Sequence, residues 1–315
     1  MVENKEEQNI PSYKNDDVDL RELVIALWKG KWIIIITSAM FAIVAVTYAI
    51  LLPNIYKSEA ILAPAELSGN SSLSKVAGQF GGLAALAGVS LGGSQSNKAD
   101  LAVEVMKSRQ FVEGFIKKHD LLVPIMASKG WKPSSDELVY DDEIYNTANN
   151  EWIREPSGLR GVVPTSQEAY DVFSKEIFSV TQDKESGLYN VSVLFYSPHI
   201  AKEWVDWLVS DINSVMRVRA IDEARKNLQY LENQLVKTSF SEMQNTFYKL
   251  IEEQTKTLML AEVQEEFAFK VIDPAVVPEV KSKPGRAMIS IFGLVLGGIL
   301  GVAIVLVRFA FSNED

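Results

Sequence analysis

Residues 287–307, AMISIFGLVLGGILGVAIVLV, are the stretch that decides the fold of this chain. The segment contains no charged residue and no proline. Its roughly 21 residues, at about 1.5 Å each, span about 30 Å, which is the thickness of the hydrocarbon core of a bilayer. Inside lipid every backbone N–H and C=O must be paired within the segment, so a lone segment of this kind has to be helical. We therefore predict a transmembrane helix over residues 287–307.

The small residues of this segment recur at regular intervals. Ser290, Gly293, Gly297 and Gly301 are spaced by three and four positions, which places them on one face of the helix. Such a face allows a second helix to approach closely. Glycine is also frequent in membrane helices for no packing reason, and that alternative stays open. We predict a packing face for the first transmembrane span or for a helix of a partner.

A second apolar segment lies near the other end of the chain. Residues 33–52, IIIITSAMFAIVAVTYAILL, carry no charge and are again long enough to cross a bilayer. Lys29 and Lys31 precede this segment, and Trp28 and Trp32 lie at the level expected for the membrane interface. The sequence therefore predicts a first transmembrane helix over residues 32–52, with the amphipathic residues 20–28 as a lead-in at the membrane surface.

The positive charges around the first span set the predicted topology. By the positive-inside rule they place residues 1–31 in the cytoplasm. Two spans then return residues 308–315 to the cytoplasm and leave residues 53–286 outside. Lys281, Lys283 and Arg286 precede the second span and argue the other way, but the first helix usually decides.

Composition excludes several classes of function. The chain has 315 residues, a net charge of −10, no cysteine and two histidines. The acidic balance argues against nucleic acid as a partner. The absence of cysteine excludes disulfides and cysteine-based zinc sites. No nucleophile elbow, nucleotide loop or metal motif is present. We predict a protein that is not an enzyme, with no catalytic residues, no cofactor and no metal.

Residues 53–198 have the mixed pattern of an α/β base domain. Helices are predicted over residues 98–119 and 165–178, the second opening with the capping box Thr165-Ser166-Gln167-Glu168. Strands are predicted over residues 178–181 and 189–196, and residues 128–160 are predicted to be loop. Residues 79–93 are rich in Gly and Ala, and two interpretations remain open: a mobile loop, or an apolar flap against the membrane or a neighbouring subunit.

Residues 199–273 contain neither glycine nor proline and show apolar residues at helical spacing. They predict a long helical projection over residues 199–266, as a rod or as a hairpin that bends near residues 238–241. Candidate faces for an oligomer or partner are Leu228, Leu231, Leu235, Phe240 and Phe247. A closing strand and a stiff proline-rich approach to the second span follow in residues 267–286, with prolines at Pro274, Pro278 and Pro284. The expected fold class is α+β, with two transmembrane helices flanking a periplasmic α/β base domain that carries the projection.

Several motifs of this chain occur in the same order in one known family. They are Val18-Asp19-Leu20, Leu27-Trp28-Lys29-Gly30-Lys31-Trp32, Met106-Lys107-Ser108-Arg109, Ser197-Pro198 with Ala201 and Trp204, and Val271-Ile272-Asp273-Pro274-Ala275. With the proline run and the glycine-bearing last span, the chain resembles the polysaccharide co-polymerases over residues 17–308. It is most similar to the bacterial determinants of lipopolysaccharide O-antigen chain length.

This resemblance implies a two-pass protein of the bacterial inner membrane that forms a homo-oligomeric ring and regulates O-antigen chain length. The implied partners are the O-antigen polymerase and, as a further candidate, lipid-linked polysaccharide. Some relatives carry a cytoplasmic tyrosine-kinase domain. This chain has no Walker motif and ends eight residues after its second span, so we expect it to lie outside that class. Enterobacterial common antigen, a capsule or an exopolysaccharide would suit the motifs equally, and a periplasmic adaptor is the other function to weigh.

Overall fold

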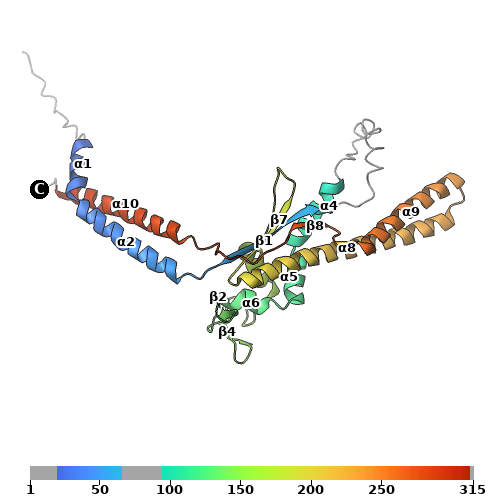
Figure 1. The fold of residues 1–315 in the computed structure, drawn as a ribbon, viewed down its shortest axis with the longest axis horizontal. Helices are drawn as coiled ribbons and strands as arrows, with labels where there is room; N and C mark the ends of the chain where they lie inside the picture. The colour runs from blue at the N-terminus through green and yellow to red at the C-terminus, as the bar shows by residue number, and fades with distance from the viewer. Residues whose placement is uncertain (1–19, 66–93, 313–315) are drawn as a thin grey trace, which may run out of the picture. The chain divides into compact units, whose positions relative to one another are not determined.

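The computed structural model describes residues 20–65 and 94–312, which fall into two compact units (Figure 1). The helical unit combines the two ends of the chain, up to Leu52 and from Pro284 onward. The α/β unit is Pro53–Lys283. The N-terminal tail before residue 20 and the Gly- and Ala-rich residues 79–93 lie outside the described residues.

The helical unit is built from α1 (Leu20–Lys29), α2 (Lys31–Leu51) and α10 (Arg286–Ser312). Helices α2 and α10 are both long and apolar enough to cross a membrane. They lie side by side in Figure 1. Both predicted transmembrane segments are therefore helical, and α10 extends five residues beyond the predicted end at residue 307.

The α/β unit is organised around one antiparallel sheet of four strands. Their order across the sheet is β6-β7-β1-β8. The strands are β1 (Tyr56–Pro64), β6 (Phe178–Gln182), β7 (Tyr189–Phe195) and β8 (Phe269–Asp273). In the register of β1 with β7, Tyr56 lies opposite Phe195. The helix that follows β7 therefore begins beside the start of β1, where the chain enters this unit.

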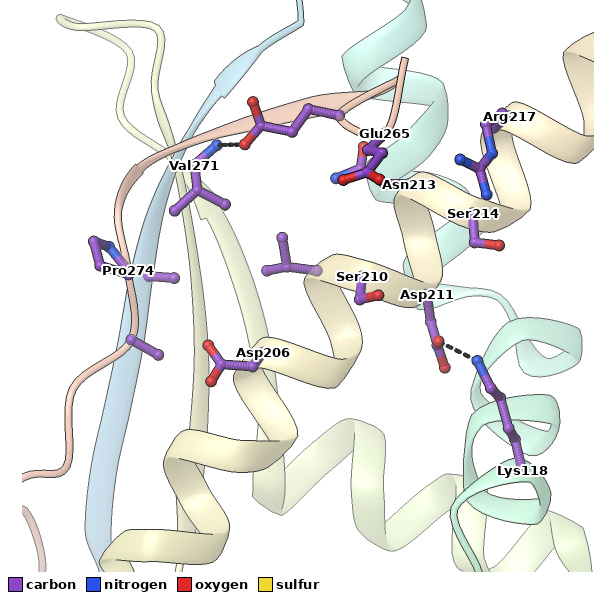
Figure 2. A pocket seen from close by; sticks show the side chains of 14 residues that line it. Lys118, Asp206, Ser210, Asp211, Asn213, Ser214, Arg217, Glu265, Val271 and Pro274 are labelled. Carbon is purple, nitrogen blue, oxygen red and sulfur yellow. Dashed lines mark hydrogen bonds and ion pairs between the residues drawn. The ribbon is translucent and has the colours of Figure 1, made fainter. Parts of the chain in front are cut away.

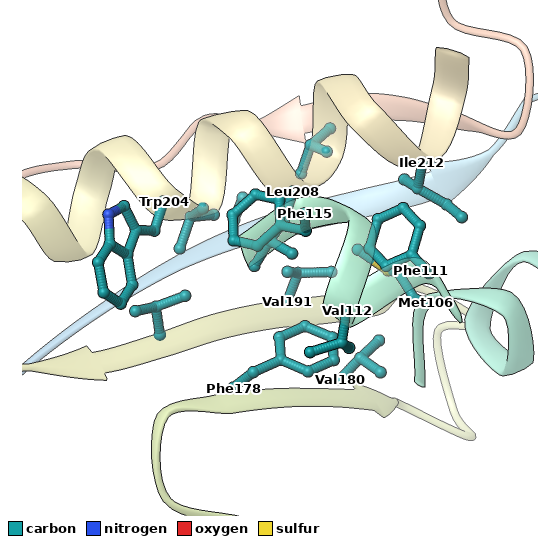
Figure 3. Close-up of a cluster of buried hydrophobic side chains, with 14 of the residues drawn as sticks. Met106, Phe111, Val112, Phe115, Phe178, Val180, Val191, Trp204, Leu208 and Ile212 are labelled. Carbon is teal, nitrogen blue, oxygen red and sulfur yellow. The ribbon is translucent and has the colours of Figure 1, made fainter. Parts of the chain in front are cut away.

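The core of the α/β unit lies between this sheet and the helices packed on it (Figure 3). The long helix α8 (Pro198–Lys237) contributes Trp204, Leu208 and Ile212, which are all nearly inaccessible to solvent. They recur every four residues, so one stripe of the helix faces the sheet. Side chains of β6, of β7 and of α5 (Arg109–Lys118) belong to the same cluster. The fold class is α+β, as predicted.

The predicted single helix over residues 98–119 is wrong, because the chain breaks at Ser108. Helix α4 (Ser94–Lys107) ends before it and α5 begins after it. Ser108 has an extended backbone, and its hydroxyl accepts a hydrogen bond from the backbone N–H of Phe111. A serine offers the first N–H groups of a new helix an acceptor, so it works as a cap here. The apolar residues keep their helical spacing across Ser108, so the spacing alone did not reveal the break.

Residues 128–160 are not a plain loop, which corrects a second prediction. They follow the short helix α6 (Leu122–Ala127) and form two small hairpins. The strands are β2 (Ser128–Lys132), β3 (Glu137–Tyr140), β4 (Tyr145–Asn146) and β5 (Glu151–Trp152). These strands have two to five residues each, too few to show an alternating pattern in the sequence.

The helix predicted over residues 165–178 starts as expected and then changes its winding. Both hydrogen bonds of the capping box between Thr165 and Glu168 are present at the start of α7 (Ser166–Val172). A five-residue π-helical turn, η1 (Phe173–Ile177), follows and leads directly into β6. Phe173 and Ile177, at its two ends, are both buried. This irregular turn left no mark in the sequence.

Helix α8 begins and ends where the sequence indicates. Ser197 caps it by accepting a hydrogen bond from the N–H of Ile200, and proline occupies the first helical position. The chain bends at residues 238–240, and α9 (Ser241–Val263) runs back alongside α8 as the second arm of a hairpin (Figure 1). The buried residues of α8 lie between Pro198 and Met216, with Ala224 beyond. The first half of α8, which the sequence assigns to a projection, is thus built into the core.

Candidate functional site

The four small residues predicted as a packing face lie on α10, and three of them meet α2 directly. A Cβ atom added to Gly297 would lie 2.8 Å from both the Cβ of Phe41 and the Cα of Ser38. A Cβ on Gly293 would collide with Ala45, and one on Gly301 with Thr37. No residue larger than glycine fits at these three positions without moving the helices apart.

Ser290 and Arg286 play other parts on the same helix. The Ser290 hydroxyl donates a hydrogen bond to the backbone carbonyl of Arg286, one turn earlier. The Arg286 Nε donates to the carbonyl oxygen of Ala49, 3.0 Å away. Ala49 belongs to the last turn of α2, whose carbonyls have no partner within the helix. Arg286 therefore satisfies one of these carbonyls and places positive charge at the negative end of the helix dipole.

The α8–α9 hairpin is held by alanines at its base and by polar contacts farther out. Ala224 and Ala261 are both buried. Beyond them, Arg225 forms an ion pair with Glu262 at 3.1 Å, and the side-chain amides of Asn227 and Gln254 lie 3.4 Å apart. These exposed contacts contribute little to stability, and the alanines let the two helices approach closely.

Most of the predicted partner face on this hairpin is partly covered already. Leu228, Leu231, Leu235 and Phe247 are half-buried, and only Phe240 is fully exposed, at 74%. Of the large apolar residues that are most exposed on the hairpin, Phe240 alone belongs to the predicted face. These most exposed residues are Tyr230, Val236, Phe240, Tyr248, Met259 and Val263. Whether the five predicted residues contact a partner remains a prediction.

The three predicted prolines border a segment that is fixed at both ends. Pro274 directly follows β8, and Pro278 and Pro284 come later on the way to α10. Near Pro274, the buried hydroxyl of Ser58 donates a hydrogen bond to the carbonyl of Val276 at 2.8 Å. Close to Pro284, Ile55 and Lys283 form an antiparallel bridge. The segment is therefore held against the start of β1.

An open polar groove of about 470 Å³ runs between α8 and the strand β8 (Figure 2). Asp206, Ser210 and Ser214 line it from α8. Glu265, in the segment between α9 and β8, and Val271, in β8, line the opposite side. Hydroxyl and carboxylate groups of this kind can bind hydrogen-bonding ligands. Their arrangement does not single out a nucleophile with an adjacent base.

Asp211 is the buried charge of this groove. Only 7% of the residue is exposed, and its carboxylate accepts from Lys118 Nζ at 2.5 Å and from His119 Nε2 at 2.9 Å. The His119 ring stacks on Trp207 with a centroid distance of 4.2 Å and an interplanar angle of 9°. Burial of a carboxylate is tolerated here because both oxygens are paired. The partner of His119 lies 92 positions away in the chain, so this contact could not be predicted from the sequence.

A neighbouring residue of α8, Asn213, ties the helix to the edge of the sheet. Its side-chain Oδ1 accepts hydrogen bonds from the N–H groups of Ala268 and Phe269, and its Nδ2 donates to the carbonyl of Phe269. All three distances lie between 2.8 and 3.0 Å. One buried amide therefore satisfies three backbone groups at the start of the edge strand β8.

The two strongest pKa shifts in the α/β unit arise from structural contacts. Arg154 donates two hydrogen bonds to Glu168, at 2.7 and 3.0 Å, and thereby lowers the pKa of that carboxyl from 4.5 to about 2. This contact stabilises the fold above pH 4.5, and its contribution is lost as the pH falls towards 2. Burial, together with a hydrogen bond to Asp100, raises the pKa of Tyr189 to about 12. Neither residue lines the groove.

Within residues 20–65 and 94–312, no three His, Asp or Glu side chains gather as they would around a metal ion. The features that stand out are instead a tightly packed pair of apolar helices, a helical hairpin with exposed apolar residues and a groove with a buried, paired aspartate.

Comparison with known proteins identifies two matching segments. Residues 16–119 match the family model described as Wzz, chain length determinant protein, and residues 236–310 match GNVR, the G-rich domain on putative tyrosine kinase. Together the two segments cover more than half of the chain. No curated protein matches it.

Two solved structures resemble the chain at low sequence identity. A full-length bacterial polysaccharide co-polymerase is 15% identical, with a TM-score of 0.36, and the match covers 94% of this chain and 99% of that one. A fragment of WzzB, a polysaccharide co-polymerase from Salmonella Typhimurium, is 13% identical, with a TM-score of 0.30, over 73% of this chain and 100% of the fragment.

The first family model includes the first apolar helix and the strand that leaves it, and the second includes α9, β8 and most of α10. The matches thus fall on the parts of the chain that connect the two units. The chain belongs to the Wzz chain length determinant family, whose members are non-catalytic regulators of polysaccharide chain length that oligomerise.

Proposed function

We propose that this protein regulates the chain length of lipopolysaccharide O-antigen in the bacterial inner membrane. In this proposal both termini are cytoplasmic and the α/β unit is periplasmic. The protein forms an oligomeric ring that holds the O-antigen polymerase and the growing, lipid-linked glycan together. The number of repeat units added before release then depends on the affinity of the ring for the polymerase and on its geometry.

The observation that carries this proposal is the α8–α9 hairpin on a unit whose two ends both lead into apolar helices. Val236 and Phe240, beside the bend of that hairpin, are 87% and 74% exposed, although they are apolar. Exposed apolar residues gathered on one element mark a surface for other protein chains. A scaffold needs such surfaces and needs no catalytic constellation.

The test is the lipopolysaccharide ladder of a strain that lacks this protein. We expect deletion to abolish the modal chain length on a gel, and complementation with the intact chain to restore it. A matched pair of variants refines the test: Phe240→Ser should shift the modal length, whereas Thr246→Ser, on the same arm of the hairpin, should not. An unchanged ladder after deletion would refute the O-antigen assignment.

The same strain distinguishes the alternatives. Regulation of common antigen, capsule or exopolysaccharide would leave the lipopolysaccharide ladder intact and change the length of that other polymer. A periplasmic adaptor, the other candidate, would alter the amount of exported polymer without altering its length distribution. The length distribution of each polymer therefore separates the three functions.

A further inference from the structure

A short segment of the α/β unit, residues 276–283, runs from the sheet to the point where the chain leaves this unit. We call this segment the strap. Ser58 holds its first residue through the carbonyl of Val276, at 2.8 Å. The backbone of Ile55 holds its other end, by hydrogen bonds with Ser282 and Lys283 of 2.8–3.1 Å. The strap is therefore pinned at both ends.

The strap contains more residues than are needed to span the distance between its two anchors. The anchors are Ile55, just before β1, and Ser58, in β1; three positions of extended chain separate them by about 10 Å. Seven residues of the strap, from Val276 to Ser282, cover the same distance. The strap therefore does not run straight between its anchors: the chain bends at residues 279 and 280, and Val280 at this bend is 77% exposed. An exposed valine on a fixed segment has a solvent cost that contact with an apolar phase would remove.

The covalent links to the apolar helices limit how far the strap can be from a bilayer. Ile55 follows the last residue of α2 by four positions, and Lys283 precedes the first residue of α10 by three. Fully extended, these links reach at most about 14 Å and 11 Å. The headgroup layer extends roughly 5–8 Å beyond each side of the hydrocarbon core. If the two helices span a bilayer, these short links keep the bridge between Ile55 and Lys283 within reach of the headgroup layer.

The charges of the strap favour an anionic surface. Lys281 and Lys283 are basic, and Glu279 is the one acidic residue of the segment. Within the described residues neither lysine forms an ion pair; Lys281 donates to the side chain of Asn54 at 3.3 Å and keeps further donors. Two lysines beside an exposed valine are the pattern expected for contact with anionic lipid.

We propose that the strap is a lipid-binding surface: Val280 contacts the bilayer at headgroup level, and Lys281 and Lys283 bind anionic phospholipid headgroups. The occupant is the membrane that holds the two apolar helices. This proposal requires that the helices span a bilayer and is independent of any role in polysaccharide length. Each could therefore fail without the other.

The test uses the full-length chain, which contains no cysteine, so that one introduced cysteine takes a label without background. Val280→Cys carries a fluorophore, and the protein is reconstituted into phosphatidylcholine vesicles with or without phosphatidylglycerol. A small fraction of the lipid bears a nitroxide on its headgroup. We expect strong collisional quenching of the label, and more of it in the vesicles with phosphatidylglycerol.

Val236→Cys is the matched control. Its valine is 87% exposed, similar to Val280, but lies at the far end of α8. That helix has 40 residues and starts beside Tyr56, so Val236 is more than 50 Å from its beginning at about 1.5 Å per residue. The label at this position should show only background quenching. A label at a second position of the strap, Val277→Cys, should be quenched as well, which guards against a local effect of one substitution.

The charge requirement is tested in the Val280→Cys background. Replacing Lys281 and Lys283 by glutamine should remove the extra quenching due to phosphatidylglycerol, because each lysine near an anionic surface favours contact by about fivefold. Lys237→Gln, an exposed lysine at the end of α8, should leave it unchanged. Quenching at residue 280 equal to that at residue 236 would overturn the proposal. So would a label that is shielded from water but not reached by the lipid nitroxide, since a protein would then cover the strap.

Discussion

At the scale of single residues, Asn213 decides how α8 is fixed to the sheet. Its amide makes three hydrogen bonds to the backbone at residues 268 and 269, and the residue is only 5% exposed. The sequence does not reveal this role. An asparagine within 40 helical residues looks like a surface residue, and its partners lie 55 positions later in the chain. Ser108 is a similar case, because a serine within apolar spacing does not by itself predict a break.

We predict that Asn213→Ala lowers the free energy of unfolding of the α/β unit by about 2–4 kcal/mol, because it leaves buried N–H and C=O groups unpaired. Urea unfolding of the detergent-solubilised chain, followed by tryptophan fluorescence, measures the change. Asn227→Ala is the control, since that asparagine is exposed on the same helix and has a single contact, of 3.4 Å. Equal effects of the two substitutions would show that the buried hydrogen bonds carry no special weight.

At the scale of elements, spacing in the sequence locates a face but not what covers it. The glycines of α10 and the leucines of α8 both recur at helical intervals. In the structure the glycines lie against α2, and Leu228, Leu231 and Leu235 are half-buried in a hairpin where α9 runs alongside. Periodicity reports that a face is covered, whereas the choice between a neighbour in the same chain and a partner depends on tertiary contacts.

For the helix pair, we predict that Gly293→Leu combined with Gly297→Leu pushes α10 away from α2, because added atoms at both positions would collide with Phe41 and Ala45. Insertion should survive, since leucine favours a membrane helix. The measurements are alkaline extraction for insertion and the polysaccharide ladder for chain length, which we expect to be disturbed.

Gly298→Leu is the matched control for this pair. A Cβ at residue 298 meets only the Ser38 hydroxyl, at 3.4 Å, which is an ordinary contact. This variant should keep the wild-type ladder. A wild-type ladder in the double variant too would mean that the small residues reflect composition alone.

At the scale of the whole molecule, the sequence was sufficient for the class of fold and for the two apolar helices. These features follow from composition and from long periodic segments, which are robust signals. The order of the four strands could not be predicted from the sequence, because β1 and β8 pair across more than 200 residues. The predicted topology relative to the membrane rests on counting positive charges. Arg286 is one of the charges that argue against it, but its hydrogen bond to the carbonyl of Ala49 gives it a structural role at this position.

We predict that a reporter fused after Asp315 is active only if it requires the cytoplasm, because two spans return the chain to the side of its N-terminus. The same reporter inserted at Lys184, in the exposed turn between β6 and β7, should show the opposite activity. Equal activity at the two sites would refute the two-pass topology.

Helix α8 also has a mechanical consequence. The helix passes without interruption from the core into the outer hairpin. Asn213, whose side chain is hydrogen-bonded to residues 268 and 269, lies 24 residues, or about 36 Å, before the last residue of the helix. A force on the hairpin end therefore acts on the inner part of α8, which the buried apolar stripe and the hydrogen bonds of Asn213 hold to the sheet. A partner that pulls on the tip would load the three hydrogen bonds that join α8 to residues 268 and 269 at the start of β8.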